Sequence, residues 1–361
     1  MNPTRNTLLA LLLTASLFTA AEAAEIDVPN DTPDINTALA MAGPGGKVIV
    51  DEGVYNQNVV FPFVNQTLES DGRVVIEGGG GLGIYVPPAA TGASIEGFQV
   101  RNCSIGIYLR GNNARVEDCL VRLTSSIGIL LVDSDHSTVA ECKIKDTGSY
   151  GLLISSTDNS TIEECKIKRT GDIGMLVLGT LNSIMDCKVS DSAGVGIQVG
   201  TELTMASGIL LDGNQVIRAG KDAIACSKLA SNCTLQYNVT REAHFDGIDI
   251  NALSDGHTLF KNKVYRSGNM GLELGGDGCT VTKNKAVQSS AQGIYVESVS
   301  NGGLYIKNKV KFSGGNGLFV WGTGNNFTQN KFMFNLGFDR FSGVALAANA
   351  WVANQYNTSN L

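Results

Sequence analysis

The sequence predicts an all-β protein, a single right-handed parallel β-helix of about a dozen coils with a short N-terminal capping helix. The first observation is a phrase of Gly, an aliphatic residue, any residue and another aliphatic residue, which recurs every 22 to 27 residues. A period in this range, built from short β-rich segments, is typical of a solenoid whose repeat is one coil. The phrase passes through a degenerate copy at Ala223 and otherwise begins at these residues: Gly106, Gly128, Gly151, Gly174, Gly196, Gly247, Gly271, Gly293, Gly317 and Gly343.

The second observation is a column that keeps step with the phrase and is occupied first by Phe98, then by Cys, then by Asn. Apolar residues usually stand three positions before this column and two after it, which predicts three short strands in each coil with turns rich in Asn, Asp, Ser and Gly between them. We expect the Asn residues to form a buried ladder with a structural role. The column reads Phe98, Cys119, Cys142, Cys165, Cys187, Asn214, Asn238, Asn262, Asn284, Asn308 and Asn330.

The composition and the first residues indicate one exported domain. The 361 residues include 43 Gly and 7% aromatic residues, too few large side chains for an ordinary globular core of this length but enough for a solenoid. Arg5, the apolar run from Leu8 to Ala21 and the small residues around Ala23 predict a signal peptide over residues 1–23. The run is too short to span a membrane. We therefore expect a secreted or periplasmic β-helix domain over residues 24–361.

Both ends of this domain are expected to be capped. Residues 32–43 have Thr32 as an N-cap, Pro33 at the first helical position and Gly43 as a stop, which predicts a short helix within an N-terminal cap and first coil over residues 24–60. We expect Trp351 to Tyr356 to break the repeat, so that residues 345–361 form a C-terminal cap.

The order of short helix, Pro-Gly-Gly at 44–46, strand and Glu-Gly-Val-Tyr at 52–55, followed by the coils, resembles the pectate-lyase-like superfamily. The resemblance covers nearly the whole mature chain and implies a right-handed parallel β-helix. The superfamily includes polysaccharide lyases, glycoside hydrolases, epimerases, carbohydrate-binding modules and periplasmic maturation factors. Function must therefore be argued from the site.

The net charge bears on the class of partner, and the cysteines bear on disulfides and metal binding. The net charge of −7 argues against a nucleic-acid partner. The four cysteines of the ladder column favour buried thiols, with disulfides between adjacent coils as the alternative. Cys233, His257 and Cys279 share another column, but their sulfurs would lie about 9.6 Å apart, too far for a tetrahedral metal site.

The third residue of each phrase is expected to point outward, and this column changes character along the chain. Leu130, Leu153 and Leu176 form an apolar stripe, which a loop or a second subunit could cover. Carboxylates and then aromatic rings follow, a composition suited to sugars. The predicted substrate-binding residues are Gln198, Tyr295, Glu297, Phe319 and Trp321, and the column reads Tyr108, Leu130, Leu153, Leu176, Gln198, Ala225, Asp249, Glu273, Tyr295, Phe319 and Ala345.

Two kinds of chemistry fit the acidic part of this column. Asp249 and Glu273 on adjacent coils would approach the spacing of the carboxylates of a retaining glycosidase. Alternatively, oxygen ligands could hold Ca²⁺, which would neutralise a uronate while a basic residue removes its C5 proton. The predicted catalytic residues are Asp246, Asp249, Glu273, His244, Arg241 and Arg266, and the Ca²⁺ ligands of the alternative are Asp222, Asp246, Asp249 and Glu273.

One short motif supports a catalytic role for Asp246. The string from Phe245 to Ile250 resembles the Asn-Thr-Asp-Gly-Ile-Asp motif of polygalacturonase-type hydrolases, although only the aspartate at 246 matches its first catalytic residue. The next coil has Asn269 where that family has an aspartate. We expect a protein that acts on an extracellular or cell-envelope polysaccharide as lyase, epimerase or glycoside hydrolase. The alternative is a non-catalytic carbohydrate-binding, maturation or structural β-helix protein.

Overall fold

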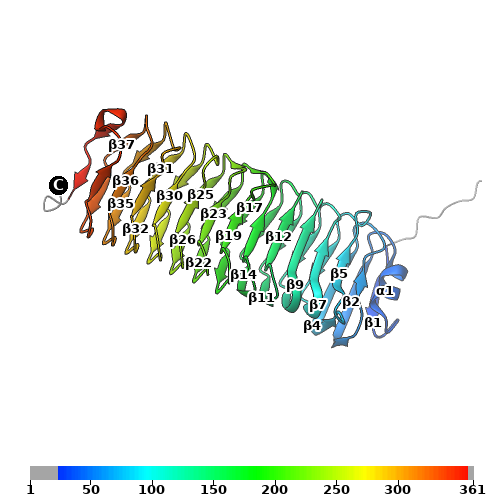
Figure 1. Ribbon diagram of the computed structural model, residues 1–361. Helices are drawn as coiled ribbons and strands as arrows, with labels where there is room; N and C mark the ends of the chain where they lie inside the picture. Colours follow the sequence, from blue (N-terminus) through cyan, green and yellow to red (C-terminus); the bar gives the residue numbers. More distant parts are fainter. Residues whose placement is uncertain (1–22, 357–361) are drawn as a thin grey trace, which may run out of the picture.

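The computed structural model describes residues 23–356 and consists of one parallel β-helix of about 14 turns (Figure 1). Every strand pairs in parallel with its counterpart one coil away, so the predicted fold class is confirmed. Residues 1–22, on which most of the predicted signal peptide falls, lie outside the described residues.

Each regular coil supplies one strand to each of three faces, which we call sheets 1, 2 and 3. Four long strands run around a corner and belong to two sheets each, namely β2 (Lys47–Tyr55), β4 (Thr67–Glu77), β7 (Gln99–Leu109) and β9 (Leu120–Val132). Sheet 1 contains the Gly-led phrase and comprises β3 (Val59–Val60), β5 (Leu82–Val86), the ends of β7 (Gln99–Leu109) and β9 (Leu120–Val132), β12 (Leu152–Ser155), β15 (Met175–Val177), β19 (Ile197–Val199), β23 (Ile224–Cys226), β27 (Ile248–Ile250), β30 (Leu272–Leu274), β33 (Ile294–Val296), β36 (Leu318–Val320) and β39 (Arg340–Ser342).

Sheet 2 precedes the ladder column and sheet 3 follows it. Sheet 2 comprises β1 (Glu25–Val28), the starts of β2 (Lys47–Tyr55) and β4 (Thr67–Glu77), β6 (Ser94–Glu96), β8 (Arg115–Glu117), β10 (Thr138–Ala140), β13 (Thr161–Glu163), β17 (Ser183–Met185), β21 (Leu210–Asp212), β25 (Thr234–Gln236), β28 (Thr258–Phe260), β31 (Thr280–Thr282), β34 (Leu304–Ile306), β37 (Asn326–Thr328) and β40 (Ala350–Val352). Sheet 3 comprises the remaining parts of β2, β4, β7 and β9 with β11 (Lys143–Thr147), β14 (Lys166–Thr170), β18 (Lys188–Ser190), β22 (Gln215–Ile217), β26 (Val239–Arg241), β29 (Lys263–Tyr265), β32 (Lys285–Val287), β35 (Lys309–Lys311), β38 (Lys331–Met333) and β41 (Gln355–Tyr356).

The asparagine ladder is present as predicted and closes the corner between sheets 2 and 3. The side-chain amide of Asn238 donates to Oδ1 of Asn262 at 3.0 Å and to the carbonyl of Leu211 at 2.8 Å, and the backbone N–H of Asn238 donates to the same Oδ1. This pattern repeats from Asn214 to Asn330. Each buried amide therefore satisfies backbone groups at a turn that has no access to water.

The last coil differs from the prediction. The strand that pairs with β36 is β39, in which Phe341 lies beside Phe319. The phrase at Gly343 predicts Ala345 at this outward position, and that prediction is wrong. Trp351 also continues the repeat rather than breaking it, because β40 pairs with β37 and the Trp351 ring stacks on Phe327 at 4.5 Å. The additional residues of this coil lie between β39 and β40, where they include the 3-10 turn Leu346–Ala348.

The N-terminal helix α1 (Ile35–Ala42) lies at the end of the rod (Figure 1). Its N-cap is Asp34 rather than Thr32, because the Asp34 carboxylate accepts the backbone N–H of Thr37 at 2.7 Å. Pro33 therefore stands before the helix and not at its first position. Gly43 ends the helix with a φ of 69°, as the sequence predicted.

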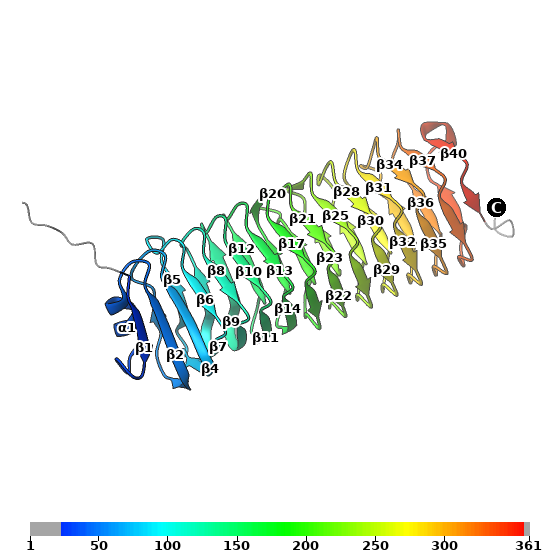
Figure 2. The same ribbon diagram turned by 180° about the vertical axis from the view of Figure 1, so that it is seen from behind.

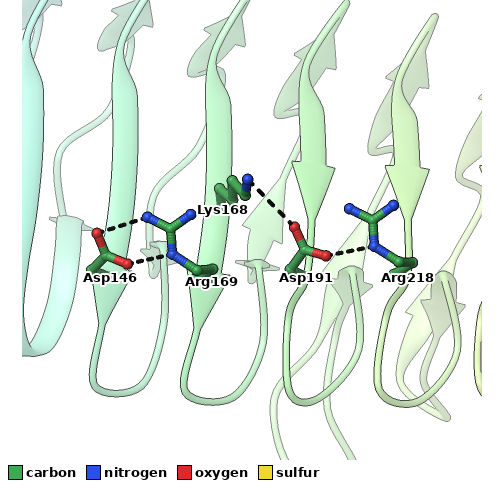
Figure 3. A network of polar contacts seen from close by, with 5 residues as sticks. All are labelled: Asp146, Lys168, Arg169, Asp191 and Arg218. Carbon is green, nitrogen blue, oxygen red and sulfur yellow. Dashed lines mark hydrogen bonds and ion pairs between the residues drawn. The ribbon is translucent and has the colours of Figure 1, made fainter.

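Alternating charges line the corner between sheets 3 and 1 (Figure 3). Arg169 pairs with Asp146 at 2.6 Å, and Arg218 pairs with Asp191 at 2.6 Å, which Lys168 also approaches at 4.0 Å. Four of these residues occupy one left-handed turn position on consecutive coils. Exposed pairs of this kind contribute little to stability, but they neutralise the corner.

All eight cysteines are buried thiols in the structure. The ladder thiols face backbone carbonyls, as in the contact of 3.5 Å between Sγ of Cys165 and the carbonyl of Val139. We expect no thiol to react with a water-soluble disulfide reagent in the native protein and eight to react in denaturant without reductant. Thiol titration checks this, and fewer than eight reactive thiols in the denatured protein would reveal a disulfide.

Candidate functional site

The outer face of sheet 1 is divided along the rod into an apolar, an acidic and an aromatic part. In the apolar part, Leu130 and Leu176 are only 8% and 6% exposed. Leu176 belongs to a small buried cluster outside the main core, and Leu153 packs against that cluster. Stacking between coils thus removes most of this stripe from water, and its predicted use as a subunit contact stays a prediction.

The acidic part begins with two aspartates that hold the corner where sheet 1 starts. Oδ1 of Asp222 accepts the backbone N–H of Asp246 at 2.9 Å, and Oδ1 of Asp246 accepts the backbone N–H of Met270 at 2.6 Å. Two coils beyond Met270, Oδ1 of Asn316 accepts the equivalent hydrogen bond from the backbone N–H of Phe338. Asp222 and Asp246 therefore position the backbone of the neighbouring coil, in addition to carrying charge.

Asp249 on β27 and Glu273 on β30 are direct register partners on the outer face. Both side chains are half-buried. The nearest amide partner of Asp249 is Asn251, at 3.4 Å. Within the described residues, neither carboxyl group accepts a backbone N–H, in contrast to Asp222 and Asp246, and both face outward.

The environment raises the pKa values of these carboxyl groups. Burial, with the negative charges of Asp222 and Asp246, raises the pKa of Asp249 to about 7. Burial, with the charges of Asp246 and Asp249, raises the pKa of Glu273 to about 9, and hydrogen bonds to Asp246 and Glu297 act in the same direction. Glu273 therefore keeps a proton at neutral pH. The cluster shares that proton and so lowers its own repulsion.

An aromatic platform follows on the next coils of the same face. The rings of Tyr295 and Phe319 lie 5.6 Å apart, and Phe319 also contacts Trp321 at 5.7 Å and Phe341 at 4.7 Å. Trp321 lies over Gly343, where an added Cβ would come within 2.2 Å of the indole, so only glycine leaves room for it. Phe341 and Gly343 were missed as site residues because the phrase was misplaced in this coil.

The predicted basic residues lie elsewhere. Arg241 is on β26 in sheet 3, where it stacks over Tyr265 at 4.6 Å. Arg266 forms an ion pair with Glu242 at 2.6 Å. His244 and Arg266 line a groove of about 550 Å³ at the corner between sheets 3 and 1, with Arg218 and Glu242 among its other walls. His244 and Arg266 thus line one groove, and neither Asp249 nor Glu273 lines it.

The other predicted binding residues lie near the acidic part. Glu297 neighbours Glu273 and is one of its hydrogen-bond partners. Gln198 lies two coils before Asp249, and its amide donates to the carbonyl of Gly200 at 3.1 Å and to Ser227 at 3.2 Å. The insertion at 201–207 contains β20 (Ala206–Ser207), which pairs with β16 (Gly179–Thr180) and β24 (Ala230–Ser231) at the edge of the solenoid (Figure 2).

The column of Cys233, His257 and Cys279 is buried and fully bonded. Nδ1 of His257 accepts the backbone N–H of Cys233 at 3.2 Å, and its Nε2 lies 2.8 Å from Oγ of Ser254. Both ring nitrogens are therefore occupied. Within residues 23–356, no three His, Cys, Asp or Glu side chains are arranged to hold one metal ion. This is also true of the predicted Ca²⁺ ligands Asp222, Asp246, Asp249 and Glu273.

Solved structures share this fold at low sequence identity. The A-module of the mannuronan C-5 epimerase AlgE6 of Azotobacter vinelandii is 14% identical, with a TM-score of 0.73 over 83% of this chain and 94% of that one. The catalytic unit of an α-1,3-glucanase of Streptomyces thermodiastaticus is 13% identical, with a TM-score of 0.58 over 93% and 69% of the two chains. The receptor-binding domain of the tailspike of siphovirus 9NA is 9% identical, with a TM-score of 0.65 over 92% and 76%. These similarities show the fold alone.

No curated protein sequence matches the chain significantly. In the part that the structure describes, no helix is long and apolar enough to cross a membrane. Two family models do match. The model for the right-handed β-helix region matches residues 71–202, and the model described as periplasmic copper-binding protein (NosD) matches residues 180–360, which is half of the chain. The chain is therefore a right-handed parallel β-helix protein that belongs to the NosD family.

Proposed function

We propose that this protein is periplasmic and that it binds a polysaccharide along the outer face of sheet 1 and hydrolyses it. The observation that supports this most is the pairing of Asp249 with Glu273 on adjacent strands, beside an aromatic platform on the same face. A polysaccharide is a linear ligand, and this face offers a linear site. The periplasmic location follows the family description and the predicted signal peptide.

The two carboxyl groups suit the two roles of a retaining glycosidase. Glu273, which holds its proton at neutral pH, donates that proton to the glycosidic oxygen as the bond to the anomeric carbon breaks. Asp249, once ionised, attacks the anomeric carbon and forms a glycosyl ester. A water molecule then returns a proton to Glu273 and its oxygen displaces Asp249, which releases the sugar. Strands one coil apart place the backbones about 4.8 Å apart, and this favours the close spacing of a retaining pair.

Asp222 and Asp246 would serve this pair by positioning it. Their hydrogen bonds hold the starts of β27 and β30, from which Asp249 and Glu273 project. Their charges also raise the pKa of Asp249, and that of Asp246 raises the pKa of Glu273. Tyr295, Phe319 and Trp321 would stack on sugar rings next to the cleavage point.

Proton abstraction from C5 of a uronate, the chemistry of a lyase or an epimerase, has less support in this arrangement. That chemistry needs a base near the substrate, and the predicted candidates Arg241 and Arg266 are engaged by Tyr265 and Glu242 at other places on the rod. The likeness to an epimerase module is a likeness of fold.

The family description also names copper. The soft thiolate and the imidazole are ligands that suit copper. The column of Cys233, His257 and Cys279 does not fit that use, because all three side chains are fully buried and both nitrogens of His257 are hydrogen-bonded. We therefore assign no step to copper.

A panel of neutral and uronate polysaccharides, incubated with the full-length mature protein with and without Ca²⁺, tests the proposal. We expect new reducing ends without the ultraviolet absorbance of unsaturated uronates, and no dependence on Ca²⁺. Absorbance by unsaturated products would identify a lyase, and altered uronate composition without cleavage would identify an epimerase. Binding without any product would support the alternative of a non-catalytic carbohydrate-binding protein.

The pKa values predict a bell-shaped pH dependence for this hydrolysis. Asp249 must be ionised, so kcat/KM should rise as the pH passes about 7, and Glu273 must be protonated, so it should fall as the pH passes about 9. Initial rates measured from pH 5 to 10 check this. A maximum near pH 5 would contradict the assignment, because Glu273 would then have the ordinary pKa of a glutamic acid.

A further inference from the structure

A basic groove runs along the corner between sheets 2 and 3, which is the corner opposite sheet 1. Its volume is about 560 Å³. Tyr237 lies at one end and the ladder residue Asn284 forms part of the floor. Its walls are six lysines from three consecutive coils, namely Lys261, Lys263, Lys283, Lys285, Lys307 and Lys309.

The repeat arranges these lysines in two straight rows. The sequence Lys-Asn-Lys occurs at 261–263, 283–285 and 307–309. The first lysine of each triplet occupies a left-handed turn position, with φ between 54° and 58°, and the second opens a strand of sheet 3 and pairs in register with the next coil. The lysines of a row are thus anchored about 4.8 Å apart along the axis.

Earlier coils show the same corner without the excess charge. There the triplets are Glu-Cys-Lys at 141–143 and 164–166 and Asp-Cys-Lys at 186–188, so that an acidic residue occupies the left-handed turn position. In the part of the chain that the structure describes, none of the ion pairs involves any of the six groove lysines. A chain with a net charge of −7 therefore concentrates unneutralised positive charge in this groove.

Two further observations indicate that these charges are held in place and are mutually repulsive. Nζ of Lys261 lies 5.2 Å from the ring of Tyr237 and 4.9 Å from that of Phe260, and Nζ of Lys283 lies 5.4 Å from Phe260. The charges of Lys311, Lys331 and Lys285 lower the pKa of Lys309. An anion in the groove would relieve this repulsion.

We propose that the groove binds a linear acidic polysaccharide, with one carboxylate on each sugar unit facing the lysine rows. Two straight rows of evenly spaced point charges suit a regular linear polyanion. A flat anionic membrane would instead favour a convex ridge of charge. The inference does not rest on the proposed hydrolysis, because the groove and Glu273 lie on different faces of the rod.

The chain provides its own matched variants for a test. Lys261→Gln, Lys283→Gln and Lys307→Gln together remove three groove charges, and Gln329 shows that the turn position accepts glutamine. Lys143→Gln, Lys166→Gln and Lys188→Gln together remove three charges from the acid-balanced coils, and Gln215 occupies that strand position naturally. Polygalacturonate is the probe, with dextran as the neutral control and phosphatidylglycerol vesicles as the membrane control.

Titration calorimetry of the mature protein at 50 and 200 mM salt should show polygalacturonate binding that weakens with salt. The groove variant should bind at least about tenfold more weakly, with a log–log salt slope smaller by about 2, while the control variant stays within about twofold of the wild type. No binding of polygalacturonate, an equal loss in both variants, or binding to vesicles in its place would overturn the proposal. Circular dichroism and melting of both variants exclude unfolding as the cause.

Discussion

Glu273→Gln should reduce polysaccharide hydrolysis by at least about 10²-fold in kcat, with little change in KM. Glutamine has nearly the same shape but no acidic proton, so the leaving oxygen would depart unprotonated. The measurement is the rate of formation of reducing ends from the polysaccharide that the panel identifies. Glu242→Gln is the matched control, since it removes a carboxylate from the corner groove at Arg266 and should leave the rate within about twofold.

The pH dependence of the unfolding free energy shows whether Glu273→Gln lowers the rate by removing the catalytic proton or by destabilising the fold. The pKa of Glu273 is raised from its ordinary 4.5 to about 9, so the folded protein binds a proton that the unfolded chain releases between those values. The contribution of Glu273 to the free energy of unfolding is therefore fully present below pH 4.5 and is lost as the pH rises to about 9. The unfolding free energy of Glu273→Gln should therefore not show this decrease between pH 4.5 and about 9, and the variant should be at least as stable as the wild type at pH 9. A variant that is inactive and also unstable at pH 9 would contradict the assigned role.

Asn262→Ala should destabilise the protein by about 3 to 5 kcal/mol. The Asn262 side chain donates to the carbonyl of Leu235 and to Asn284, and it accepts from the backbone and the side chain of Asn238. Alanine removes the partner of the Asn238 backbone N–H, the side-chain donor to the Leu235 carbonyl and one of the two bonds of the Asn238 amide, at about 1 to 3 kcal/mol for each buried group that finds no other partner. Denaturant unfolding, monitored by circular dichroism, measures the change.

Asn326→Ala is the control for the ladder. Asn326 lies on the outer side of β37, where its Oδ1 accepts only the Thr328 hydroxyl, so its loss should cost less than about 1 kcal/mol. Equal effects of the two substitutions would mean that the ladder amides contribute no more than surface asparagines do.

The fold could be predicted because two independent columns repeat in the sequence. The phrase with Gly247 and the ladder with Asn262 each fix the register of a coil, and together they place Asp249 beside Glu273 without knowledge of any turn. The errors arose where a turn changes length. In the last coil Gly343 fits the phrase, but Phe341 has the correct 22-residue step from Phe319.

The residues that surround Asp249 and Glu273 were harder to predict than the register that pairs these two residues. Arg241 is only eight residues from Asp249, yet a corner separates them, so they lie on different sheets. Closeness in sequence says little about closeness across such a corner. The groove lysines show the same limit, because Lys263 and Lys285 resemble ordinary surface residues until the turn geometry places Lys261 and Lys283 beside them.

A crystal structure of the Glu273→Gln variant with an oligosaccharide of the identified polysaccharide would locate the bound sugar. We expect a sugar chain along the outer face of sheet 1, with a ring stacked on Tyr295, Phe319 or Trp321 and a glycosidic oxygen within hydrogen-bonding distance of the side chain at position 273. A sugar chain bound only over Leu130, Leu153 and Leu176, or only in the corner groove beside His244, would contradict this expectation.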